Sequence, residues 1–214
     1  MIQPPVPTTS GGGVAFSDAS DGDIRADPAR RSDLARRLGI PDRWATLTQV
    51  HGSRVVEVDE PGDQGKADAM FTSIAGLPLA IFTADCAGVV VQAPGAVGVA
   101  HAGWRGAADG VVATLIAAMR RAGFEPSDAA IGPTLGACCL EVGSEVSARF
   151  EGFTTNTSWG SPSIDLGKAV VAQLDGIQTW TADRCTMHEQ GSFSHRRDRT
   201  LARMAAIGWV EDHR

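Results

Sequence analysis

The chain has 214 residues, of which 43% are hydrophobic and 21% are charged, and its formal net charge at pH 7 is −6. This length suits one domain with a substantial core. The acidic balance disfavours nucleic acid as the main partner, since binding its backbone usually needs a basic face. Every apolar run falls short of the roughly 20 residues that span a bilayer, so we expect no membrane partner.

The N-terminal sequence MIQPPVPTTSGGG lacks the basic start and the apolar middle of a signal peptide. We expect a flexible tail over residues 1–13 and one domain over residues 14–214. Because no export signal is evident, we predict a cytoplasmic location. Four cysteines without the regular spacing of a disulfide framework are then expected to be reduced thiols: Cys86, Cys138, Cys139 and Cys185.

The first predicted element is a helix over residues 28–38. It has Asp27 at the N-cap, Pro28 at the first helical position and Gly39 as its stop. Residues 60–66 read as a loop. Apolar runs bounded by turn residues predict short strands in this half of the chain: 44–50, 55–58, 79–83, 89–92 and 97–100.

In the second half, apolar residues at helical spacing predict a long helix over residues 107–122. Shorter helices are expected over 144–150 and 165–174, with a surface loop over 152–163. The remaining strands are predicted over 129–131, 177–181 and 201–209. Several strands are joined by connections too short for helical crossovers, which favours a mixed-sheet α/β sandwich over a doubly wound parallel sheet.

Three side chains with nitrogen or sulfur ligand atoms follow or end apolar strands: His51, Cys86 and His101. The hairpin between the last two would bring them to the same edge of a sheet. Zinc binds thiolate and neutral imidazole, and three protein ligands leave a fourth position for water or substrate. The spacing matches no short zinc motif, so a buried cysteine and two hydrogen-bonded histidines in the core are an equally good interpretation.

The sequence AGWRG follows His101 and leads directly into the predicted long helix. Gly103 and Gly106 allow a tight turn, so the helix start and Arg105 would together bind a phosphate-sized anion. The alternative is a simple glycine turn with a solvated arginine. The segment FSHRRD, which contains Arg197, would add a second cationic group, although arginine runs are usually solvated.

Seven short motifs occur along the chain: TQVHG (48–52), ADAMFT (67–72), TADC (83–86), AHAGWRG (100–106), IGP (131–133), CCLEVG (138–143) and FSHRRD (193–198). In content and order they resemble the bacterial YfiH-like (DUF152) family. Its members are variously described as laccase domain proteins, polyphenol oxidases, peptidoglycan editing factors and zinc-dependent purine nucleoside phosphorylases. The resemblance runs from about Phe16 to Trp209.

The resemblance implies an α/β sandwich of the cysteine-hydrolase-like group, with residues 14–214 as its catalytic domain. The family's zinc ligands fall on the three residues already chosen. Other family positions imply catalytic roles for Asp68, Asp85 and Arg105, and substrate or phosphate binding by Gly103, Arg105, Gly106 and Arg197. Leu140 and His195 stand where the family usually has tyrosine, which bears on substrate preference.

The first functional hypothesis is a zinc-dependent purine nucleoside phosphorylase acting on adenosine, inosine or methylthioadenosine with inorganic phosphate, and having adenosine deaminase activity. The second is a copper-dependent polyphenol oxidase, which is disfavoured because a multicopper centre needs more histidines than the five present. The third is a hydrolase of peptidoglycan precursors with Cys86 as nucleophile and His101 as base. The fourth is a scaffold with structural zinc. We expect a monomer or homodimer.

Overall fold

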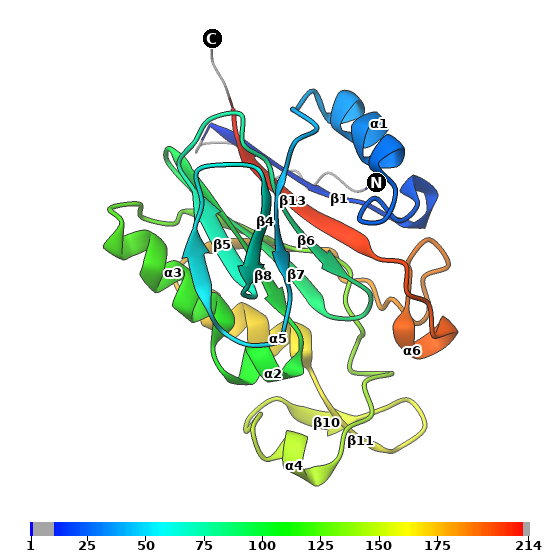
Figure 1. Ribbon diagram of the computed structural model, residues 1–214. Coiled ribbons are helices and arrows are strands. Elements are labelled where there is room, and N and C mark those ends of the chain that lie inside the picture. Colours follow the sequence, from blue (N-terminus) through cyan, green and yellow to red (C-terminus); the bar gives the residue numbers. More distant parts are fainter. Residues whose placement is uncertain (2–10, 212–214) are drawn as a thin grey trace.

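Two β-sheets lie face to face in the computed structural model, which describes residue 1 and residues 11–211, and helices cover both outer faces (Figure 1). The sheets contain both parallel and antiparallel pairs. This architecture confirms the predicted mixed-sheet α/β sandwich. None of the helices in the described ranges has the length and hydrophobicity that a membrane span requires.

The five-stranded sheet has buried, largely apolar strands at its centre. Its order is β1 (Gly12–Phe16), β13 (Met204–Val210), β6 (Leu79–Thr83), β2 (Ala45–Thr48) and β4 (Gly62–Lys66). Its outer face packs against α1 (Pro28–Leu38), which begins at the predicted cap Asp27 and ends at Gly39 in the left-handed conformation. A short 3-10 turn, η1 (Ala19–Asp21), precedes α1.

The six-stranded sheet lies at the centre of the molecule, between the other sheet and the helices on its outer face. Its order is β12 (Gln178–Thr181), β9 (Asp128–Ile131), β7 (Ala87–Ala93), β8 (Ala96–Ala102), β5 (Ala69–Thr72) and β3 (Val55–Glu57). Its outer face is covered by α2 (Trp104–Ala108), α3 (Val111–Arg121) and α5 (Leu166–Val171), the last continued by η2 (Ala172–Leu174).

Strand β7 is buried along its whole length, which explains its continuous apolar sequence. Val90 packs between the two sheets, whereas Val89 and Val91 face the helices. The hairpin of β7 and β8 places Gly88 opposite His101. This register brings the turn before β7 next to the end of β8, as the sequence predicts.

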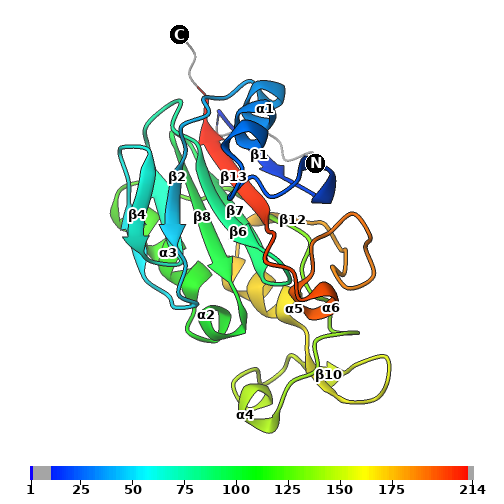
Figure 2. The same cartoon turned by 45° about the vertical axis from the view of Figure 1, so that its right-hand side comes forward.

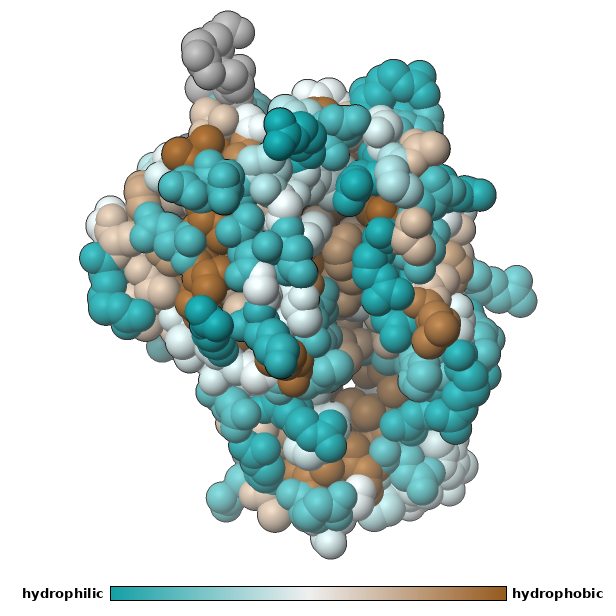
Figure 3. Space-filling view, in the orientation of Figure 1, coloured by the Kyte–Doolittle hydropathy of each residue, from teal (hydrophilic) through white to brown (hydrophobic). Residues whose placement is uncertain are grey.

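A smaller lobe lies beyond one end of the sheets (Figures 1 and 2). It contains α4 (Ser144–Ser147) and the hairpin of β10 (Thr154–Asn156) and β11 (Pro162–Ile164). Between this lobe and the sheets, Figure 3 shows a hollow with hydrophobic atoms inside it. A last short helix, α6 (His195–Asp198), lies beside the start of β13.

Several predicted boundaries are wrong for physical reasons. The long helix over 107–122 is two helices, because Gly110 adopts a left-handed φ of 73° between α2 and α3. The expected loops 60–66 and 152–163 contain β4, β10 and the start of β11, which are mostly exposed and therefore lack the apolar alternation of buried strands.

The predicted tail over 1–13 falls largely on residues 2–10, which lie outside the described residues. Gly12 and Gly13, however, belong to β1 and pair with Val210 and Trp209. A Cβ on Gly13 would overlap the indole of Trp209. The strand therefore has glycine at position 13 because the indole of Trp209 occupies the space that a side chain there would need.

The two sheets approach closely at Gly208. A Cβ placed there would lie 2.7 Å from methyl carbons of both Val90 and Val97. We expect Gly208→Ala to lower the free energy of unfolding by about 1–3 kcal/mol, because the added methyl group overpacks the core. Urea denaturation measures this change.

Gly167→Ala is the matched control, because the nearest atom to a Cβ at Gly167 is 3.6 Å away and this glycine lies in α5. It is expected to raise stability by about 0.5–1 kcal/mol, since alanine favours the helix. Equal urea midpoints for the two variants would contradict the close approach of the sheets.

Candidate metal centre

Three side chains from separate segments converge at one end of the sheets. Ligand atoms of His51, Cys86 and His101 all lie within 4.8 Å of one another. The two imidazole rings meet edge to face, with centroids 4.7 Å apart. His51 follows β2, Cys86 precedes β7 and His101 lies near the end of β8. The structure thus brings together the three residues that the sequence singles out.

The buried carboxylate of Asp68 connects two of these segments, those of His51 and His101. It accepts hydrogen bonds from the backbone N–H groups of Val50, His51 and Gly52, at 3.1, 2.8 and 2.7 Å. Its Oδ1 also lies 2.8 Å from Nδ1 of His101. These bonds support the left-handed φ of 63° at His51 and leave Nε2 of His101 for Cys86 or a metal.

Burial and hydrogen bonding act in opposite directions on the charges of this group. Burial alone would raise the pKa of Asp68, but the bonds from His101 and the backbone hold it below its usual value. Burial would likewise raise the pKa of Cys86, yet His101 and His51 lower it to about 6. Burial would lower the pKa of His101, which Asp68 and Cys86 raise to about 9.

At neutral pH the metal-free group therefore contains a thiolate beside an imidazolium. The thiolate is the form of cysteine that binds metals. Because an imidazole must be neutral to bind a metal, ion binding would release the proton of His101. The charge distribution fits both a metal site and a reactive thiol.

The donor set suits zinc. One thiolate and two imidazoles are borderline-soft ligands of the kind that zinc prefers, and three protein ligands are typical of zinc sites with an open position. Gly103 lets the backbone pass close to the ligands, because a Cβ there would lie 3.0 Å from Sγ of Cys86. At Gly106 a Cβ would lie 2.7 Å from the carbonyl oxygen of Gly52. Both glycines thus serve close packing around the ligands.

The three ligands open into a cavity of about 820 Å³, within the usual size range of small-molecule sites. The lining includes the apolar side chains Phe82, Trp104, Leu135, Leu140 and Leu166, and the cationic or polar side chains Arg25, His195, Arg196 and Arg203. The carboxylates of Asp63 and Asp85 also line it. The cavity therefore offers both apolar surface and anion-binding groups beside the ligand group.

Neither of the two arginines expected to bind phosphate lines this cavity. Arg105 is exposed, and its guanidinium lies 4.2 Å from the ring centre of Trp104. Arg197 pairs with Asp198 and donates hydrogen bonds to four backbone carbonyls, those of Thr186, Met187, Glu189 and Ser192. The side chain of Arg197 thus holds the loop before α6 in place.

Arg25 and Arg203 were not predicted as site residues, because they come from segments that no motif connects. Nη2 of Arg25 donates to the carbonyl of Leu201, and Nη1 of Arg203 donates to those of Thr200 and Ala202. Both therefore meet at the segment before β13. Arg196 does belong to the FSHRRD motif, but the sequence does not show which of its arginines faces the cavity.

Asp85 lines the cavity and also joins three segments of its wall. Its left-handed φ of 93° directs Oδ1 to the hydroxyl of Thr186, at 2.6 Å, and Oδ2 to the backbone N–H of Arg196, at 2.7 Å. Its carbonyl accepts hydrogen bonds from the N–H of Leu135 and the hydroxyl of Thr134. Asp85 therefore positions the residues around Cys86.

We expect Asp68→Asn to weaken zinc binding about 10–100-fold, as is usual when a hydrogen-bond partner of a metal ligand is lost. The amide replaces an acceptor oxygen with a donor, so His101 and the backbone donors compete for one oxygen. Titration of the metal-free protein with zinc measures the affinity, and circular dichroism checks the fold.

The control is Asp63→Asn, which changes a cavity carboxylate that bonds Thr48. It should leave zinc affinity unchanged. If Asp68→Asn bound zinc as tightly as this control, the orienting role of Asp68 would be refuted.

Comparisons with known proteins identify relatives of this chain. A family model described as multi-copper polyphenol oxidoreductase laccase matches residues 15–211. The purine nucleoside phosphorylase ORF3 of Streptomyces griseus is 37% identical over 218 residues, covering 94% of this chain and 88% of that protein.

Two solved structures have the same fold. YlmD from Geobacillus stearothermophilus matches with a TM-score of 0.86 and 30% identity, covering 96% of this chain and 94% of that one. The hypothetical protein YfiH from Bacillus licheniformis matches with a TM-score of 0.85 and 25% identity, covering 94% and 93%.

Proposed function

Because the chain belongs to the multi-copper polyphenol oxidoreductase laccase family, which includes YfiH-like proteins, we propose that it is a zinc-dependent purine nucleoside phosphorylase. It would convert a purine nucleoside and inorganic phosphate into the free base and ribose 1-phosphate. The observation that carries the proposal is a three-ligand Cys/His group facing a cavity lined by both apolar and cationic side chains. The name of the Streptomyces griseus relative supports the reaction.

The lining of the cavity suggests which groups bind each substrate. A purine base is flat and largely apolar, so it fits against apolar lining residues such as Leu135 and Leu140. Phosphate requires charge-assisted donors, and guanidinium groups supply them in bidentate geometry. Arg196 and Arg203 line the cavity, and we assign to them the role that the sequence suggested for Arg105 and Arg197.

A zinc ion held by the ligand group would supply a Lewis acid able to activate water, which is the chemistry that adenosine deamination needs. The accompanying adenosine deaminase activity is thus part of the proposal. Nε2 of His101 faces the ligand group because Asp68 holds Nδ1. Adenosine, inosine and methylthioadenosine are the substrates to test.

The two carboxylates expected to act in catalysis have positioning roles in this proposal. All the hydrogen bonds of Asp68 hold His101 and the loop around His51, and its side chain is fully buried. Both oxygens of Asp85 accept hydrogen bonds from the cavity wall. Such contacts fix geometry and leave neither group free to move toward a substrate.

Copper-dependent oxidation of polyphenols is the weaker candidate, although the family name refers to it. The ligand group contains two of the chain's five histidines. A Cys-His-His group can hold one copper ion of the electron-transfer kind, but a multi-copper cluster needs more ligands. Metal analysis of the purified protein separates zinc from copper.

A thiol hydrolase is the candidate with its own structural support, namely the thiolate and imidazolium that Cys86 and His101 form without metal. Its substrate would be a peptidoglycan precursor. The two functions respond differently to metal removal: a hydrolase keeps its activity in a chelator and loses it on thiol alkylation.

We expect Cys86→Ala and His101→Ala to reduce phosphorolysis to background, because each removes a ligand of the catalytic ion. Chromatography of adenosine reactions with and without phosphate detects free adenine, ribose 1-phosphate and inosine. Chelated wild-type protein should regain activity on addition of zinc. Phosphorolysis that persists in the zinc-free variants would contradict zinc dependence.

We expect Arg196→Met and Arg203→Met each to raise the KM for phosphate about 10–100-fold, because each removes one charge-assisted hydrogen bond to phosphate. Arg105→Met should leave this KM unchanged, because Arg105 stacks on Trp104 outside the cavity lining. Phosphate titration of initial rates measures all three. If only Arg105→Met raised this KM, phosphate would instead bind at Arg105.

A further inference from the structure

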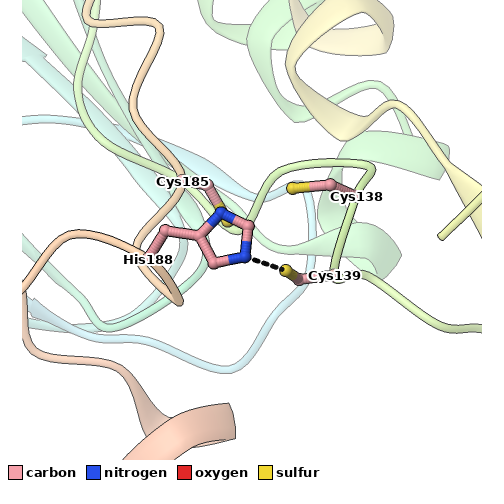
Figure 4. Close-up of side chains that lie close together, drawn as sticks. All are labelled: Cys138, Cys139, Cys185 and His188. Atoms are coloured by element: carbon pink, nitrogen blue, oxygen red, sulfur yellow. Dashed lines mark hydrogen bonds between the residues drawn. The ribbon is translucent and has the colours of Figure 1, made fainter. Parts of the chain in front are cut away.

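A second group of metal-ligand side chains lies apart from the one described above. Ligand atoms of Cys138, Cys139, Cys185 and His188 all lie within 4.8 Å of one another. Figure 4 shows the four side chains pointing toward one another from two separate loops. Sγ of Cys139 lies 3.3 Å from Nε2 of His188. Cys139 is buried and His188 is exposed, so the group reaches from the core to the surface.

These distances resemble those of a tetrahedral site. Zinc–sulfur bonds of about 2.3 Å and zinc–nitrogen bonds of about 2.0 Å place neighbouring ligand atoms roughly 3.5–3.8 Å apart. The Cys139–His188 separation is slightly shorter, and the limit of 4.8 Å for the whole group is slightly longer. Small side-chain rotations therefore suffice to place four ligands around one ion.

The surrounding backbone is built around the sulfur atoms. The N–H of Gly136 donates a hydrogen bond to Sγ of Cys185 at 3.2 Å, a contact that stabilises a metal-bound thiolate. A Cβ on Gly136 would lie 3.2 Å from Sγ of Cys138 and 3.1 Å from Cβ of Cys185. Glycine at this position thus lets the backbone amide approach the cluster.

The two loops are also joined by the backbone. Thr134 forms a parallel bridge with Cys185, with hydrogen bonds from Thr134 N to the carbonyl of Arg184 and from Thr186 N to the carbonyl of Thr134. Parallel pairing of β9 with β12 brings these segments together, because each loop directly follows one of the two strands. The four ligands are therefore held on a defined framework.

We propose that Cys138, Cys139, Cys185 and His188 form a second zinc site, which is structural. Four protein ligands close the coordination sphere, as in other Cys₃His sites, whereas the first group has three ligands and opens into the cavity. Tetrahedral sulfur-rich coordination with one imidazole selects zinc over magnesium or calcium. The number of protein ligands thus gives the two zinc ions different roles, catalytic at the first group and structural at the second.

The second ion would fix the cavity wall. Leu135 and Leu140 line the cavity and flank Cys138 and Cys139 in the first loop. The carbonyl of Cys139 also accepts a hydrogen bond from Nη1 of Arg196, at 3.5 Å. Zinc at this site would therefore hold these two leucines and Arg196, the proposed phosphate ligand, in fixed relative positions.

Elemental analysis of protein purified under reducing conditions tests the site without reference to activity. Wild type is expected to contain two zinc ions per chain, and Cys185→Ser and His188→Ala one each. Cys86→Ala is also expected to contain one, because it loses the other ion. His195→Ala, an exposed histidine on α6, should retain both.

Cobalt substitution then identifies which ion remains. In Cys86→Ala the remaining cobalt should show strong thiolate charge-transfer absorption, and this absorption should disappear when His188→Ala and Cys139→Ser are added. His188 is exposed, so His188→Ala keeps the test valid even where a cysteine variant misfolds.

One zinc ion per wild-type chain, with the same content in His188→Ala, would overturn the second site. Cys86→Ala protein that binds no cobalt would overturn it as well. A protein with two ions but no phosphorolysis would refute the proposed reaction and leave the second site standing.

Discussion

The candidate centre depends on one buried carboxylate, that of Asp68. Removing an ionised group from water is costly, and only several hydrogen bonds to its charged form offset that cost. Three consecutive backbone N–H groups and the ring of His101 supply them. Because these donors belong to the loop after β2 and to β8, this interaction joins the two sheets at the position of the ligands.

The close stacking of the two sheets makes this interaction geometrically possible. Gly88 and Gly208 take the positions where a side chain would separate β7 and β13 from the opposite sheet. Gly88 pairs with His101 in the β7–β8 register, so sheet spacing and ligand position are linked. Burial of Asp68 and His101 excludes water from the contact between them and strengthens it.

The sequence predicted that the three side chains of the candidate centre would meet, because they sit at strand ends within distinctive motifs, and the structure brings them together. His51, Cys86 and His101 follow from chemistry and motif together. The two arginines expected in the phosphate site illustrate the limit of this approach, since a guanidinium binds backbone carbonyls, as Arg197 does, as readily as an anion. Side-chain direction depends on tertiary contacts that residue types do not reveal.

The second ligand group, made of Cys138, Cys139, Cys185 and His188, was not predicted for a related reason. Cys138 and Cys139 resemble small core residues, and the spacing of Cys185 and His188 alone is too weak a signal. Only the parallel pairing of β9 and β12 brings the two pairs together. In the same way, the exposed and glycine-rich strand β4 carries no apolar pattern, so its pairing with β2 decides its structure.

The topology of the five-stranded sheet has a consequence for biosynthesis. Strand β13 is made last among the strands, yet it lies between β1 and β6 and contacts the core of the molecule. During translation, β1 and β6 emerge with their pairing edges vacant and exposed to aggregation. A nascent chain thus completes its sandwich only when the ribosome has released residues 204–210, so chaperone protection is most valuable until that stretch has emerged.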